Sequence, residues 1–85
     1  MPLAFILINT ESGTEDMVIQ ELRKIKGIIE LHTLYGMHDI IVKVNIKDHP
    51  DKLKDDIIWK IRRINEVQST TTLLVADSHI PAEEK

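Results

Sequence analysis

Residues 29–46 read IELHTLYGMHDIIVKVNI, and this stretch decides the fold because it has the pattern of a β-hairpin. Two runs of alternating apolar and polar residues flank a turn-forming segment, Gly36 to Asp39. A loop of two or four residues predicts that Tyr35 pairs with Ile40. The other pairs that keep one face apolar are Thr33–Val42, Leu31–Val44 and Ile29–Ile46. The pairs expected on the opposite face are His32–Lys43, Glu30–Asn45 and Leu34–Ile41.

Two helices and two further strands surround this hairpin. A strand at 3–9 is apolar on both faces, so we expect both faces to be covered. A helix begins at Thr14, a suitable cap, and ends before Gly27, where a left-handed residue is favoured. A second helix begins near 48–51, and the last strand covers 70–76. The second helix has apolar residues at helical spacing, namely Leu53, Ile57, Ile61 and Ile64, with Trp59 off this stripe.

The predicted order is βαββαβ, which right-handed crossovers fold into a ferredoxin-like sandwich of class α+β. Its antiparallel sheet has strand order 4-1-3-2, with both helices on one face. The first and third strands then lie in the middle, which agrees with their apolar character. We expect one domain over residues 1–76 and a polar tail over residues 77–85.

Two helices cover only one face of such a sheet, so the other face should carry an apolar patch. This patch contains Leu34 and Ile41, together with one set from the first strand, either Leu3, Phe5 and Leu7 or Ala4, Ile6 and Ile8. Monomers rarely leave a patch of this kind open to water. We therefore expect a homodimer in which two sheets pack face to face about a two-fold axis.

Composition excludes several classes of function. The chain has 85 residues, a formal net charge of −3 and no cysteine. An acidic chain lacks the cations that a nucleic-acid binder uses to neutralise phosphates. Without cysteine there are no disulfides, zinc ribbons or thiol nucleophiles. The apolar runs are too short to span a membrane, and we expect a cytoplasmic protein.

Catalytic and cofactor signatures are also absent from the sequence. The four histidines are scattered without metal-ligand spacing, and no glycine-rich phosphate loop is present. We therefore expect no catalytic residues, no metal site and no cofactor. The cations Lys60, Arg62 and Arg63 are interpreted as a solvated helix face.

The hairpin loop is the best candidate for a binding site. Asp39 could bind the ammonium group of a small zwitterion, while nearby amides or hydroxyls bind its carboxylate. The same residues also suit a plain β-turn, with Gly36 at positive φ and Asp39 capping the turn. The run Ser69, Thr70, Thr71 and Thr72 could supply hydroxyls to the same ligand, although threonine is also an ordinary strand residue.

These segments resemble a known family. The stretches GIIE at 27–30, LYGMHDIIVKV at 34–44 and INEVQSTTTLLV at 64–75 are similar to the C-terminal effector (RAM) domain of the Lrp/AsnC, or feast/famine, transcription regulators. The resemblance implies a βαββαβ domain that dimerises through its sheet, assembles into rings such as octamers, and binds an amino acid between dimers. The implied effector-binding residues are Tyr35, Gly36, Met37, His38, Asp39, Thr70, Thr71 and Thr72.

No helix-turn-helix precedes the domain in this sequence, so it resembles the stand-alone effector-domain members of the family. The implied role is amino-acid sensing without direct DNA binding, with helix-turn-helix relatives as candidate partners. Two alternatives remain at this point. One is an enzyme similar to dimeric α/β-barrel monooxygenases, and the other is an ACT-like regulatory domain with its ligand near Glu11-Ser12-Gly13.

Overall fold

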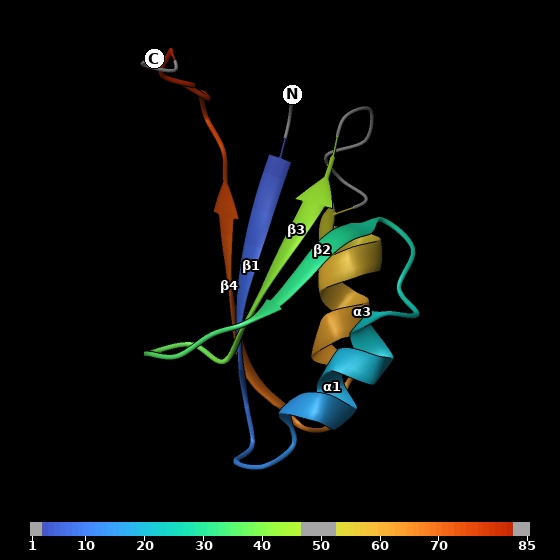
Figure 1. Cartoon of the computed structure of the whole chain (residues 1–85). Helices are drawn as coiled ribbons and strands as arrows, with labels where there is room; N and C mark the ends of the chain where they lie inside the picture. The colour runs from blue at the N-terminus through green and yellow to red at the C-terminus, as the bar shows by residue number, and fades with distance from the viewer. Residues whose placement is uncertain (1–2, 47–52, 83–85) are drawn as a thin grey trace.

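The computed structural model describes residues 3–46 and 53–82 (Figure 1). Its elements in chain order are β1 (Leu3–Thr10), α1 (Glu15–Leu22), β2 (Ile28–Thr33), β3 (Ile40–Asn45), η1 (Leu53–Ile58), α3 (Trp59–Arg62) and β4 (Val67–Leu74). The strands form one antiparallel sheet in the order β2-β3-β1-β4, with the helices on one side. The predicted ferredoxin-like topology and strand order are confirmed.

The structure shows which of the two alternating apolar sets of β1 faces the helices. Burial alternates strictly along it, and the buried set is Ala4, Ile6, Ile8 and Thr10. The set on the open face, which includes Phe5 and Leu7, is only partly covered. Because β1 pairs with β3 on one edge and β4 on the other, its backbone is hydrogen-bonded on both sides.

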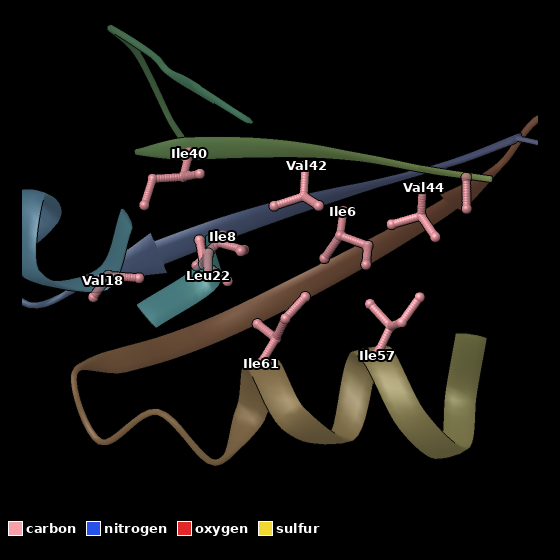
Figure 2. Close-up of a cluster of buried hydrophobic side chains, with 10 residues drawn as sticks. Ile6, Ile8, Val18, Leu22, Ile40, Val42, Val44, Ile57 and Ile61 are labelled. Atoms are coloured by element: carbon pink, nitrogen blue, oxygen red, sulfur yellow. The ribbon is translucent and has the colours of Figure 1, made fainter. Parts of the chain in front are cut away.

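The core lies between the sheet and the helical layer. Figure 2 shows Ile57 and Ile61 pointing from the helical segment toward Ile6 and the β3 side chains. The buried apolar residues are Ala4, Ile6, Ile8, Val18, Leu22, Ile40, Val42, Val44, Ile57 and Ile61. Each fully buried isoleucine or leucine contributes about 1.5–3 kcal/mol relative to exposure. Trp59, which the pattern places off the helix stripe, is more than half exposed.

The expected hairpin register is wrong by two residues. Thr33, not Tyr35, pairs with Ile40, and Leu31 pairs with Val42. The other face pairs His32 with Ile41 and Glu30 with Lys43, in place of the pairs predicted there. The shift by two keeps every side chain on its predicted face between Glu30 and Thr33.

A β-bulge between Ile28 and Glu30 breaks the pattern at the start of β2. Because of this bulge, Ile28 packs against the core together with Leu31, while Ile29 is half exposed. The expected pair between Ile29 and Ile46 is therefore absent from the register. The cause is general: an extra residue in one strand of a pair changes which residues lie opposite each other.

Both helices differ in detail from the prediction. Thr14 lies at the N-cap of α1, but its hydroxyl donates a hydrogen bond to the Glu11 carbonyl at 2.7 Å rather than accepting one from the helix. Helix α1 ends at Leu22, and two tighter turns lead to Gly27. The expected start of the second helix at 48–51 lies outside the described residues. Within the described ranges, this helical region consists of the π-helical η1 followed by α3, and no helix there is long and apolar enough to cross a membrane.

The structure predicts that Gly27→Ala destabilises the fold more than its matched control, Gly13→Ala. Both glycines have a left-handed φ, of 103° and 81°, so each substitution costs about 1–2 kcal/mol through the backbone. Only at position 27 would the new Cβ meet a neighbour, Ile57 Cδ1 at 2.8 Å. Because Ile57 is in the core, we expect an additional loss of about 1–3 kcal/mol in urea unfolding. Equal losses in the two variants would contradict this prediction.

Candidate functional site

Asp39 fixes the loop between β2 and β3 to the end of β1. Its Oδ2 accepts a hydrogen bond from the Thr10 backbone N–H at 2.8 Å and a longer one from the Thr10 hydroxyl at 3.4 Å. Its backbone N–H donates to the Ile8 carbonyl, and its carbonyl accepts from the Leu34 N–H. The Asp39 carboxylate therefore positions the loop. No donor among the described residues contacts its other oxygen, Oδ1.

The tip of this loop stands away from the fold. In Figure 1 it projects to the left of the sheet, whereas the helices lie on the right. Tyr35 and Met37 are almost completely exposed, and Gly36 has a φ of 134° with open space around its Cα. His38 is half-buried, and its Nδ1 is buried without a hydrogen-bond partner among the described residues. The loop tip therefore exposes the ring of Tyr35, the thioether of Met37 and the backbone of Gly36, and all three are accessible to a ligand or another protein.

The threonine run lies on β4, at the other edge of the sheet from β2. Thr70 and Thr72 pair with Ile8 and Ile6, so they share the helix-side face, whereas Thr71 pairs with Leu7 on the open face. Only one or two of the three hydroxyls can therefore face a given ligand.

One protomer does not bring the loop and the threonine run together. Ile40, Ile8 and Thr70 form one row across β3, β1 and β4, so β1 separates the two candidate segments. Neighbouring strands lie about 4.8 Å apart, which puts β3 and β4 about 10 Å from each other. The ammonium and carboxylate of an α-amino acid are attached to a single carbon atom. A single α-amino head group therefore cannot bridge these backbone positions within one copy.

A polar groove lies beside the start of β4. Its lining residues are Arg62, Val67, Gln68, Ser69 and Thr70. Its volume of about 390 Å³ falls within the range of roughly 300–1,000 Å³ typical of small-molecule pockets. Of the predicted site residues, only Thr70 lines it. Ser69, which belongs to the hydroxyl run considered from the sequence, lines it as well, whereas Arg62 and Gln68 give no sequence signal of their own.

The open face of the sheet is apolar at its centre and charged at one side. Phe5 pairs with Leu73, and Leu7 pairs with Ile41, so their side chains gather on this face. Toward β2, the Glu30 carboxylate lies 3.4 Å from His32 Nε2 and 3.9 Å from Lys43 Nζ. These exposed pairs contribute about 0–1 kcal/mol each, so the apolar centre dominates the energetics of the face.

Comparison with known proteins identifies the family of this domain. The sequence model of the family described as the Lrp/AsnC ligand binding domain matches residues 3–84 of this chain. This match extends past residue 76, so the expected domain boundary there stays a prediction. The HTH-type transcriptional regulator PH0140 of Pyrococcus horikoshii is 32% identical over 73 residues, which are 86% of this chain and 46% of that protein. The chain spans about half the length of the curated relatives that it matches.

Solved structures show the same fold. FFRP-DM1 is 37% identical with a TM-score of 0.79, over 88% of this chain and 99% of that chain. The transcriptional regulator NMB0573 of Neisseria meningitidis, solved as an L-Met complex, has a TM-score of 0.76 over 89% of this chain and 50% of that chain. Its identity is 15%, so it shows the fold alone. The family match favours an effector domain over the monooxygenase-like and ACT-like alternatives.

The geometry of Asp39 predicts that Asp39→Ala destabilises the protein by about 1.5–3 kcal/mol. The loss arises because the buried Thr10 N–H would lose a charged acceptor. Asp39→Asn keeps an oxygen acceptor at the same place and should lose clearly less. Urea unfolding of both variants measures the difference. If Asp39→Ala were as stable as the parent protein, the carboxylate would not hold the loop.

Proposed function

Because this chain belongs to the Lrp/AsnC ligand-binding domain family, we propose that it is a small-molecule-responsive module of transcription regulation that binds an amino acid. Its relatives are transcriptional regulators, so its role is regulatory rather than catalytic. The observation that carries the amino-acid proposal is the anchored carboxylate of Asp39 beside the exposed, glycine-containing loop tip. A fixed carboxylate with one oxygen still open is suited to an ammonium group.

The loop tip can supply the remaining contacts of such a ligand. Tyr35 offers a ring and a hydroxyl, and the backbone around Gly36 offers N–H groups to a carboxylate. His38 Nδ1 needs a partner that a ligand or a neighbouring protomer would provide. The L-Met complex of NMB0573 makes amino acids the first class of ligand to test.

We propose that the ligand lies between copies of the chain. The distance across β1 keeps the loop and the β4 residues of one protomer apart, so Thr70, Thr71 or Thr72 would reach the ligand from a neighbouring protomer. Assembly is then part of sensing, because a ligand that contacts two protomers stabilises their association by mass action.

The basic unit of this assembly is proposed to be a dimer through the open sheet face. The apolar side chains that a second copy would cover are Leu3, Phe5, Leu7, Ile41 and Leu73. Leu73 is about half exposed in the single chain, and a second sheet would remove it from water. Dimers of this kind would join through their loops into an octamer or a similar ring.

Contact with DNA is proposed to come from a helix-turn-helix unit outside these 85 residues, supplied by an Lrp/AsnC-type regulator. The formal net charge of −3 gives the domain itself little attraction for phosphates. A module that acts on transcription works where the DNA is, so we propose that the protein is cytoplasmic.

The dimer proposal predicts that Leu7→Lys lowers dimer affinity by at least about 100-fold, because the new ammonium group would be buried between two sheets. Met17→Lys is the matched control, since Met17 is exposed on α1 in the helical layer. Light scattering at micromolar concentration measures the mass of both variants and of the parent protein. A monomeric parent protein, or dissociation by both variants, would contradict the proposed interface.

The effector proposal predicts that a small subset of the twenty amino acids raises the melting temperature. A ligand at 100 times its dissociation constant stabilises the folded state by about 2.7 kcal/mol, which thermal unfolding detects readily. Asp39→Asn should remove most of this stabilisation while preserving the fold, because the neutral amide binds an ammonium group weakly. No response to any amino acid would leave the protein as an assembly module without this class of effector.

A further inference from the structure

We infer that Arg62, together with the exposed edge of β4 at Thr70, forms a carboxylate-binding subsite for the small-molecule effector. The inference rests on the proposed function and assigns a further specificity-determining residue. In this arrangement Asp39 binds the ammonium group of a zwitterion, and Arg62 of a neighbouring protomer binds its carboxylate together with the backbone N–H groups around Gly36.

The groove at Arg62 differs from two other surface grooves in the charged residues that line it. The groove between α1 and β2 includes Asp16 and Glu30 beside its one cation, Arg23. The groove between α1 and the end of α3 combines Lys60 and Arg63 with Glu21 and Glu66. The groove at Arg62 has a cation and no carboxylate in its lining, so of these three grooves in the described part of the chain it alone should favour an anion.

Arg62 is available for a ligand. It is exposed, and no carboxylate of the described residues lies within ion-pair distance of its guanidinium. A guanidinium group presents donors in a planar fork that matches the two oxygens of a carboxylate. Its unpaired state in a polar groove therefore fits a carboxylate ligand better than a purely structural role.

The backbone of β4 adds donors to the same groove. The Val75 N–H donates to the Leu3 carbonyl, so Val75 faces β1. Backbone direction alternates along an antiparallel strand, which turns the N–H of Thr70 away from β1. β4 is an edge strand, so this N–H points outward beside the groove. With the hydroxyl of Thr70 and the amide of Gln68, the groove offers both charged and neutral donors to an anion.

The matched variants Arg62→Met and Arg63→Met test this subsite. Both replace a cation on consecutive residues by a flexible apolar side chain, but Arg63 lines the other, mixed-charge groove. Calorimetric titration uses the amino acid that gives the largest thermal shift. We expect Arg62→Met to weaken its binding at least about tenfold and Arg63→Met to change it less than about threefold.

A carboxamide analogue of the same amino acid separates direct contact from a structural effect. Arg62→Met should leave the affinity for this neutral analogue unchanged, whereas a structural disturbance would weaken both ligands equally. Equal affinities of the two variants for the amino acid, or equal losses for both ligands in Arg62→Met, would overturn the inference.

If none of the twenty amino acids binds, the proposed effector class fails and the subsite is tested with a simple carboxylate. Sodium butyrate is titrated against sodium chloride at equal ionic strength, and the amide resonances of Ser69 and Thr70 are followed by NMR. Butyrate-specific shifts that disappear in Arg62→Met would support the subsite alone. Absence of such shifts in the parent protein would overturn it.

Discussion

Strand β1 is covered on both edges and on one face only, and the rest of the structure follows from this constraint. Its buried face, with Ile6 and Ile8, requires the helical layer, because apolar residues on a central strand are stable only when shielded from water. Its other face, with Phe5 and Leu7, is apolar but only partly covered. The helices thus bury one face of the sheet in the core, and the apolar side chains on the other face stay partly exposed to water.

The topology could be predicted from the sequence because it depends on local patterns. Alternation in the strands and helical spacing at Val18, Leu22, Ile57 and Ile61 are readable without tertiary contacts. The two faces of β1 could not be told apart, because both are apolar. The expected hairpin register is wrong because the loop spans residues 34–39, longer than predicted, and its last residue is held to Thr10, 29 residues away in sequence. A contact of this kind leaves no trace in a local pattern.

The candidate site, like the fold, could be predicted from the sequence only in part. The loop from Tyr35 to Asp39 stood out because glycine, an aromatic residue and a carboxylate occur close together. The structure gives Asp39 a structural partner as well, so the turn interpretation and the binding interpretation are not exclusive. The sequence indicates only a solvated cation at Arg62, since only the fold shows that this residue borders a groove without carboxylates. The part played by a charged surface residue depends on its neighbours in space, which a single sequence does not reveal.

The anchoring of Asp39 also links two distant parts of the protomer. Its bond to Thr10 is followed at once by the bond from the Glu11 N–H to the Glu66 carbonyl, at 2.9 Å, just before β4 begins. A ligand on the open oxygen of Asp39 would therefore act on the Arg62 groove through this chain of bonds, which runs by way of Thr10 and Glu11. Linkage requires such an influence to be reciprocal: whatever occupancy of the groove does to the loop, occupancy of the loop does to the groove. If protomers assemble into the proposed ring, each gives its loop to one neighbour and its groove to another. A coupling between loop and groove would then let binding at one interface change the affinity at the next, which is cooperative binding.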